Sequence, residues 1–294
     1  MGTGVAAGSD GAFTLEPRRK SMIRSMRDRR AAFCKLHDSG CFVLPNPWDA
    51  GSARMFQHLG FQALASSSTA YAWTTGRADY AITLSDVLTH LKILCAAVDV
   101  PVNADFESGF ARDPEDLAVN IRKAIETGVA GLSVEDRALD GSELLFDTAL
   151  SVERIRAARQ AIEQSGQDVV LVGRTEWLLE DPGAVTPAID KLVALAEAGA
   201  DCLYAPGVRE KADIAAMVRA VAPKPVNVVM SRPGLSLAEL RDLGVRRVSL
   251  GGAVARVAWA AVIRTMEQIK AGSFDGLAEG TPGGHLDEVF GRFR

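Results

Sequence analysis

Two carboxylic acids close a short apolar stretch of the sequence, VNADFESGF, at residues 102–110. Asp105 and Glu107 are two positions apart, so on an extended strand both side chains point to one face and Phe106 points to the other. Gly109 follows them, where the chain can turn away. Such a pair of acids could bind a metal ion, act as an acid–base pair, or belong to a solvated loop.

Polar residues also follow other short apolar runs, and together they have the chemistry of a metal–carboxylate site. Asp105, Glu107 and Glu135 offer the hard oxygen donors that Mg²⁺ prefers, one binding directly and the others through water. Arg174 has the planar fork that grips a carboxylate with two hydrogen bonds. Backbone N–H groups at 67–69 could hold developing negative charge on an oxygen. Each residue alone is more often a helix cap, a salt bridge or part of a turn, and it is the combination that favours the metal site.

The elements that must position these residues repeat along the chain. Four segments share a helix end, a glycine and a short apolar run: QHLGFQALAS (57–66), IETGVAGLSV (125–134), AEAGADCLYA (196–205) and RDLGVRRVSL (241–250). Glycine after a helix can adopt a positive φ and close the last turn. The continuous apolar run that follows it indicates a strand buried on both faces.

With four further runs, the sequence predicts eight strands, centred near residues 44, 65, 104, 133, 172, 203, 228 and 249. Helices are expected between them, at about 50–59, 85–98, 114–127, 151–165, 183–198, 210–221, 236–243 and 253–271. Ser85, Asp113 with Pro114, and Ser236 indicate helix starts. Eight such units predict an α/β fold, a (β/α)8 TIM barrel. The alternative, an open doubly wound sheet, would favour a glycine-rich phosphate turn after its first strand, which FVLPNPWDAG is not.

In a barrel the C-terminal strand ends share one rim, where three adjacent strands then deliver carboxylates. In chain order, the polar residues at these ends are Asn46 and Asp49, Ser66 to Thr69, Asp105 and Glu107, Glu135 and Asp136, Arg174 and Glu176, Tyr204, Asn227, and Ser249. We divide the chain into a mobile tail at 1–18, a catalytic barrel at 19–272 and an extension at 273–294. The extension either packs on the barrel rim or a neighbouring subunit, or is disordered.

Composition excludes several classes of protein. The 294 residues are 48% apolar with a net charge of −4, which allows a large core and gives no basic stripe for nucleic acid. No apolar run approaches the roughly 18 residues that span a membrane. The four cysteines, Cys34, Cys41, Cys95 and Cys202, have no ligand-like spacing, which indicates free thiols in a reducing cytoplasm. The four histidines fall in helical or tail contexts and do not indicate a metal site.

Five segments, in order, resemble the isocitrate lyase/phosphoenolpyruvate mutase superfamily, most closely its phosphoenolpyruvate-mutase-like, methylisocitrate-lyase-like branch. They are LPNPWDAGSAR (44–54), LASSSTAYAWTTGRAD (64–79), PVNADFESGF (101–110), GVAGLSVEDR (128–137) and LVGRTE (171–176), and LGVRRVSLGG (243–252) also fits. The resemblance covers roughly residues 25–272.

The resemblance implies a (β/α)8 barrel enzyme that forms a homodimer or homotetramer, with the last helix exchanged between subunits. Members bind Mg²⁺, with Mn²⁺ as an alternative, and make or break a C–C or P–C bond beside an α-oxo-acid through an enolate chelated by the metal. Carried over by position, Asp105 would ligate the metal directly, and Asp79, Glu107 and Glu135 would hold its waters.

The same resemblance implies the residues that bind the substrate. Arg174 would bind it, and the amides at Ser68 and Thr69 would hold a carboxylate. With Ser67 and Asn227 these residues complete the predicted substrate-binding set, and Arg174 and Glu135 are the predicted catalytic residues. The metal would act as a Lewis acid on the enolate oxygen, while Arg174 fixes orientation.

The sequence departs from the family after the fourth strand. Its lyases carry a Lys-Cys-Gly-His type run there and its mutases a lysine and an asparagine, whereas residues 137–147 contain no cysteine, lysine, histidine or asparagine. The mutases also have a histidine near the position of Pro206. Tyr71, Arg137, Ser142 and Glu143 stay open as proton donors.

Three functions therefore stay open. The first is a Mg²⁺-dependent lyase or decarboxylase acting on a small 2-oxo or 2-hydroxy di-acid. The second is a phosphonate-processing mutase or hydrolase. The third is a barrel that binds a 2-oxo-acid with little or no turnover. We expect no nucleic-acid or membrane partner for any of them.

Overall fold

Eight parallel strands form the centre of the protein, and a computed structural model describes them within residues 25–138 and 144–293. The strands are β1 (Phe42–Leu44), β2 (Leu64–Ala65), β3 (Val102–Asp105), β4 (Gly131–Glu135), β5 (Val170–Arg174), β6 (Cys202–Tyr204), β7 (Val226–Val229) and β8 (Arg247–Ser249). All eight predicted strands are confirmed. Their shortness reflects a barrel in which each strand contributes only a few inward side chains.

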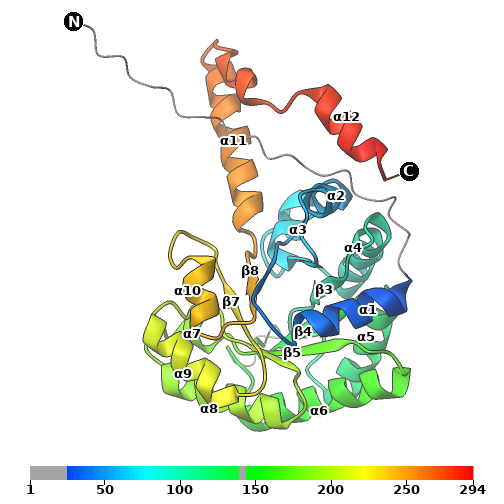
Figure 1. Ribbon diagram of the computed structural model, residues 1–294, viewed down its shortest axis with the longest axis vertical. Helices are drawn as coiled ribbons and strands as arrows, with labels where there is room; N and C mark the ends of the chain where they lie inside the picture. Colours follow the sequence, from blue (N-terminus) through cyan, green and yellow to red (C-terminus); the bar gives the residue numbers. More distant parts are fainter. Residues whose placement is uncertain (1–24, 139–143, 294) are drawn as a thin grey trace, which may run out of the picture.

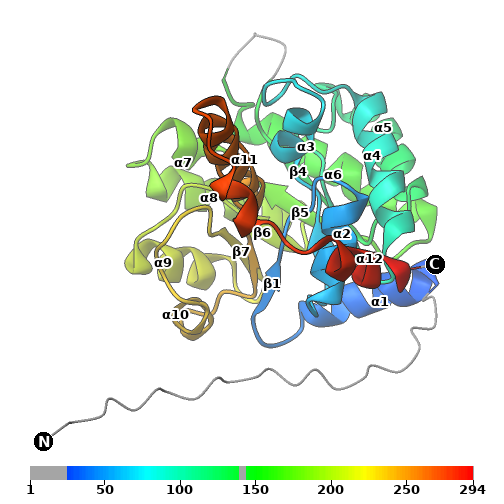
Figure 2. The ribbon, with the colours of Figure 1, turned by 90° about the horizontal axis from the view of Figure 1, so that it is seen from above.

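The sheet closes on itself into a barrel (Figure 2). The strand order is β1-β8-β7-β6-β5-β4-β3-β2, and β1 pairs in parallel with β8, with Leu44 opposite Ser249. Between β1 and β2 a backbone hydrogen bond of 3.0 Å runs from Ala65 N to Pro45 O. The predicted (β/α)8 TIM barrel is thereby confirmed.

Helices surround the strands, and the eight predicted ones are present. They are α2 (Ala50–His58), α4 (Leu84–Ala97), α5 (Pro114–Glu126), α6 (Thr148–Ser165), α8 (Val185–Glu197), α9 (Lys211–Val221), α10 (Leu237–Asp242) and α11 (Ala253–Lys270). Five short elements were not predicted: α1 (Met26–Leu36), α3 (Ser68–Thr74), α7 (Trp177–Glu180), the 3₁₀ helix η1 (Asp275–Glu279) and α12 (Gly283–Gly291). The serine run that we considered as a turn is the start of α3, because the Ser67 hydroxyl accepts a hydrogen bond from Ala70 N.

Helix caps follow the sequence signals with one correction. Asp113 caps α5 with Pro114 in its first turn, and Ser236 caps α10, both as predicted. The start of α4 is set by Thr83 rather than Ser85, because Thr83 and Asp86 form a reciprocal capping box.

The apolar core lies between strands and helices, and a second cluster fills the N-terminal end of the barrel. There Phe33 of α1 is fully buried against Leu44, Val172 and Cys202. In the described part of the chain, no helix has the length and hydropathy to cross a membrane.

Helix α11 rises away from the barrel, and the chain then returns so that α12 packs on α2 (Figure 1). Of the residues of α11, Ala255 is buried, whereas large apolar side chains such as Val257, Ile263 and Met266 are more than half exposed. The exchange of this helix between subunits stays a prediction, and the tail at 1–18 lies outside the described residues.

Candidate active site

Arg174, at the end of β5, is the centre of a cluster of buried carboxylates. Its Nη1 lies 3.0 Å from Asp105 Oδ1, its Nη2 lies 3.1 Å from Glu135 Oε2, and its Nε donates to Glu176 Oε1 at 2.5 Å. The acids come from the ends of β3, β4 and β5, so the three adjacent strand ends converge. Burial acts to lower the pKa of Arg174, but the charges of Glu135, Glu176 and Asp105 outweigh it and raise that pKa well above its usual value.

Asp105 is also held by the start of helix α3. Ser68 donates to Asp105 Oδ2 twice, from its backbone N at 3.0 Å and from its hydroxyl at 2.9 Å. The hydroxyl of Ser66 accepts from Asp105 N at 2.8 Å. The first N–H groups of a helix have no partner within the helix, so a carboxylate is a favourable partner for them. The amide predicted to hold a substrate carboxylate is thus bound to Asp105.

Phe106, between Asp105 and Glu107, is buried in the core, as predicted. Glu107 has a left-handed φ of 49° and is 1% exposed, and neither of its carboxylate oxygens has a hydrogen-bond partner. Burial, with the nearby charges of Asp105 and Asp79, raises the pKa of Glu107 to about 8. A strained, buried acid without partners is typical of a functional position.

Glu135 resembles Glu107 in its surroundings. It is 2% exposed, and neither of its oxygens accepts a hydrogen bond, although Arg174 is close. Burial raises the pKa of Glu135 well above its usual value, against the opposing charge of Arg174. Glu176 adds a further free oxygen, since its Oε2 is buried without a partner.

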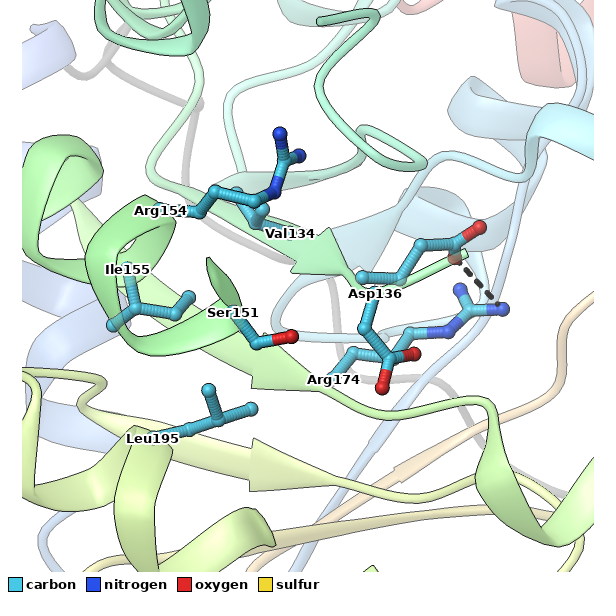
Figure 3. A pocket seen from close by; sticks show the side chains of 8 residues that line it. Val134, Asp136, Ser151, Arg154, Ile155, Arg174 and Leu195 are labelled. Atoms are coloured by element: carbon cyan, nitrogen blue, oxygen red, sulfur yellow. Dashed lines mark ion pairs between the residues drawn. The ribbon is translucent and has the colours of Figure 1, made fainter. Parts of the chain in front are cut away.

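Asp136 is separated from this cluster, although it is the next residue after Glu135. Its Oδ2 lies 2.6 Å from Lys191 Nζ and accepts from the Thr175 hydroxyl at 2.7 Å, and its Oδ1 accepts from Glu176 N at 2.8 Å. Figure 3 shows Asp136 beside Arg174, with Ser151 and Leu195 reaching in from the helices behind the strands. These residues border a small pocket of about 10 Å³, room for roughly one water molecule. Of these two neighbours, Glu135 therefore belongs to the cluster around Arg174, and Asp136 belongs to an ion pair with Lys191.

The loop after α3 brings two more groups toward the rim. Asp79, predicted as a metal-site residue, is exposed, and its charge acts on Glu107. Tyr80, which the sequence did not single out, has a left-handed φ of 60°. Burial and the charges of Glu135 and Glu176 raise the pKa of Tyr80. The Arg137 guanidinium stands 5.4 Å from the Tyr80 ring centroid.

The open proton-donor candidates have different positions. Tyr71 stacks on His90 with ring centroids 3.9 Å apart, and Arg137 forms an ion pair with Glu180. Ser142 and Glu143 lie outside the described residues.

The other members of the predicted substrate-binding set have different surroundings. Ser67 uses its hydroxyl as the cap of α3, and the side chain of Thr69 lies close to Gly252. Asn227 is 1% exposed, accepting from Arg247 Nε at 2.9 Å and donating to the Ser249 hydroxyl at 3.0 Å. Its amide is thus engaged inside the barrel rather than presented at the rim.

Two residues could have been found from the sequence. Glu176 stands two positions after Arg174, the same spacing that drew attention to Asp105 and Glu107. Lys191 lies on the buried face of α8 with Ala188 and Leu195, where a lysine needs a partner.

The donor set fits a hard divalent cation, although the acids are not arranged as ligands. Among residues 25–138 and 144–293, no three acidic, histidine or cysteine side chains form a ready-made ligand group. Arg174 gives the reason, because its guanidinium already pairs with Asp105, Glu135 and Glu176. The four oxygens of Glu107 and Glu135 are buried and lack hydrogen bonds, which is the environment that a cation would satisfy.

The phosphoenolpyruvate phosphomutase family model matches residues 33–270, most of the chain. The chain belongs to this family. A solved structure of a Burkholderia cenocepacia J2315 protein is 41% identical, with a TM-score of 0.88 over 90% of this chain and 97% of that one. The chain is thus an enzyme of the phosphoenolpyruvate mutase/isocitrate lyase type, as the resemblance implied.

Two proteins similar to this chain are named for reactions. The oxaloacetate decarboxylase of Rhodopseudomonas palustris is 29% identical, over 84% of this chain and 87% of the relative. The structure of 2,3-dimethylmalate lyase, described as a PEP mutase/isocitrate lyase superfamily member, is 28% identical with a TM-score of 0.80, over 92% of this chain and 96% of that one. The named substrates are a 2-oxo di-acid and a 2-hydroxy di-acid.

Proposed function

We propose that this protein is a Mg²⁺-dependent lyase or decarboxylase that cleaves the C–C bond beside the carboxylate or oxo group of a small 2-oxo or 2-hydroxy di-acid, through an enolate. The observation that carries the proposal is the Arg174 cluster, in which one guanidinium faces Asp105, Glu135 and Glu176, and in which Glu135 and Glu176 are buried and keep oxygens without hydrogen bonds. The names of the decarboxylase and the lyase support the class of substrate.

Asp105, Glu107, Glu135 and Asp79 would hold the Mg²⁺, with Mn²⁺ as an alternative. The cation would supply a Lewis acid for the negative charge that develops on the substrate oxygen. Arg174 would bind the substrate carboxylate, because its fork can exchange a protein carboxylate for a substrate carboxylate at little geometric change. Glu135 would help to hold that fork in place.

Burial keeps water away from two acids of the rim. Glu107 and Glu135 are at most 2% exposed, so charges act over short distances in surroundings that contain little water. The hydroxyl and amide of Ser68 fix Asp105, which keeps that carboxylate aimed at the centre of the rim.

A substrate panel tests the proposal. Protein with Mg²⁺ would be incubated with oxaloacetate, 2,3-dimethylmalate, 2-methylisocitrate or phosphonopyruvate, following pyruvate, oxalate and phosphoenolpyruvate as products. We expect turnover of a C–C substrate and thermal stabilisation by oxalate plus Mg²⁺, because oxalate resembles the enolate of pyruvate. Asp105→Asn should lose both, while the surface variant Asp242→Asn should keep both.

Other outcomes would replace the proposal. The description of the family model favours a phosphonate-processing mutase or hydrolase as the second candidate, and turnover of phosphonopyruvate alone would establish it. Stabilisation by oxalate plus Mg²⁺ without turnover of any substrate would indicate a binding barrel. Unchanged metal binding in Asp105→Asn would contradict the assignment of the site.

We also propose that a second copy of the chain covers α11, in a homodimer or homotetramer. The exposed apolar side chains of this helix support this proposal, since Trp259 is 45% exposed and Val262 is 50% exposed. Light scattering on the wild type and on Val262→Glu tests it. The variant should have a lower molar mass in solution, because fewer subunits associate. A monomeric wild type would contradict it.

A further inference from the structure

A buried ion pair behind the candidate site connects helix α8 to the ends of β4 and β5. Lys191 Nζ lies 2.6 Å from Asp136 Oδ2, and both side chains are 1% exposed. Burying two charges costs several kcal/mol per ion, which their attraction offsets only with good geometry and further hydrogen bonds. Such a pair adds little net stability. Its contribution is the position in which it holds the residues that it contacts.

Lys191 contacts three segments that border the rim. Besides Asp136, its Nζ donates to the backbone oxygen of Phe146 at 2.5 Å and lies 5.4 Å from the centroid of the Trp177 ring. Phe146 N in turn donates to the backbone oxygen of Asp136 at 2.7 Å. One ammonium group therefore ties together the end of β4, the segment before α6 and the start of α7.

Asp136 transfers this constraint to the residues after Arg174. Its two oxygens accept from the Thr175 hydroxyl at 2.7 Å and from Glu176 N at 2.8 Å, so the two residues that follow β5 are held, Thr175 by its side chain and Glu176 by its backbone. Glu176 then accepts from Arg174 Nε at 2.5 Å. The contacts form a continuous series from Lys191 through Asp136 and Glu176 to Arg174.

The last contact helps to orient the guanidinium. A hydrogen bond at Nε restricts the rotation of the planar guanidinium and so limits the directions in which its Nη groups point. In Arg174 these groups face Asp105, 3.0 Å from Nη1, and Glu135, 3.1 Å from Nη2.

We propose that Lys191 and Asp136 are positioning residues that hold Glu176, and through it the Arg174 fork, in the orientation that binds a substrate carboxylate. Neither Lys191 nor Asp136 touches the rim side of Arg174. The catalytic consequence rests on the proposed function, whereas the orientation of Arg174 can be measured without substrate or metal.

The test compares Lys191→Met and Lys191→Arg with Lys211→Met, a lysine paired with Glu239 on the surface. We expect Lys191→Met to lower kcat/KM for oxaloacetate by about 10–100-fold, mainly in kcat, as is usual for residues that orient a site. Lys191→Arg should restore part of the rate, and Lys211→Met should change nothing. In metal-free protein labelled at arginine Nε, the Arg174 Nε–H signal, assigned with Arg174→Lys, should exchange faster in Lys191→Met.

A milder variant covers the case in which Lys191→Met does not fold. Thr175→Val removes the hydroxyl that donates to Asp136 and keeps the shape of the side chain, and it should shift both readouts in the same direction by less. A lower Tm with unchanged kcat, KM and Arg174 signal would show a purely structural pair and overturn the inference. A wild type without turnover, combined with a changed Arg174 signal in the variants, would overturn the proposed function and support the positioning role.

Discussion

The two ends of the barrel each bury an arginine on a strand, in opposite surroundings. At the C-terminal rim, Arg174 faces the carboxylates of Asp105, Glu135 and Glu176. Toward the N-terminal end, Arg247 is 3% exposed and donates from Nε to Asn227 Oδ1 at 2.9 Å, above the ring of Phe33. Within residues 25–138 and 144–293, no carboxylate forms an ion pair with Arg247.

The pKa values of the two groups show what this difference means. Burial acts to lower both, but the surrounding acids raise the pKa of Arg174, whereas burial prevails and lowers the pKa of Arg247. The rim thus gathers more acids than its arginine pairs with, which suits a cation. The N-terminal end buries Arg247 among uncharged partners and has the character of a floor.

The size of a hollow does not identify the site. A hollow of about 1190 Å³ lies at the N-terminal end, where His37, Arg159 and Arg246 border it. Some of its charged groups are engaged, since Arg159 pairs with Asp201 and Arg246 donates to Gly40 O. Free buried carboxylate oxygens lie at the other end, and they locate the chemistry better than volume does.

Replacing each of the two arginines with lysine, in separate variants, should give the largest difference in activity between the two ends. Arg174→Lys should lower kcat/KM for oxaloacetate by about 10²–10³-fold, because an ammonium cannot replace a fork that contacts several acids. Arg247→Lys should keep kcat/KM but lower the free energy of unfolding by about 1–3 kcal/mol through lost hydrogen bonds. Kinetics and urea unfolding measure both effects. A folded Arg247→Lys protein without turnover would contradict the division into site and floor.

Replacing one glycine of positive φ at each end compares the loss of unfolding free energy at the two ends. Gly109, below the acids, has a φ of 74°, and a Cβ there would lie 2.1 Å from Leu117 Cδ1. Gly40, between α1 and β1, has a φ of 78° and open space around it. Gly109→Ala should cost about 3 kcal/mol and reduce stabilisation by oxalate plus Mg²⁺, whereas Gly40→Ala should cost about 1 kcal/mol and leave that stabilisation intact. Equal costs in thermal unfolding would show that the clash with Leu117 is relieved by movement.

The smallest expected effect concerns pH at the N-terminal end. Burial, with the charge of Arg247, lowers the pKa of His37 to about 4 from its ordinary value of 6.5. The unfolded chain binds this proton more readily, so the stability due to His37 is complete above pH 6.5 and is lost as the pH falls toward 4. His37→Gln should reduce the pH slope of unfolding free energy there by up to about 1.4 kcal/mol per pH unit.

His90 provides the control for that measurement. Burial lowers the pKa of His90 to about 4 as well, so the part of the slope due to His90 should persist in His37→Gln and be removed in the double variant with His90→Gln. Turnover at pH 7.5 should be unaffected by His37→Gln. A slope identical to that of the wild type would show that His37 is protonated equally well in both states.

The candidate site was predicted less completely than the barrel. Local patterns indicated all eight strands and placed Asp105, Glu107, Glu135 and Arg174 at their ends, because glycine caps and apolar runs act over a few residues. They did not predict α3 as a helix, because seven residues with a serine start resemble a turn. They singled out Glu135 for the site but gave no role to Asp136, which the structure pairs with Lys191.

The sequence alone therefore determined the order of the elements and the set of acids and bases at the strand ends. The tertiary structure decided which of them meet: Arg174 and Asp105 are 69 positions apart, and Lys191 reaches Asp136 from a helix on the other side of the strands. Helix and strand formation depend on neighbours in the chain, whereas a buried charge takes whichever partner packing brings to it. For this reason the sequence indicated the acids of the rim, whereas the structure showed which of them pair with Arg174 and that Asp136 pairs with Lys191.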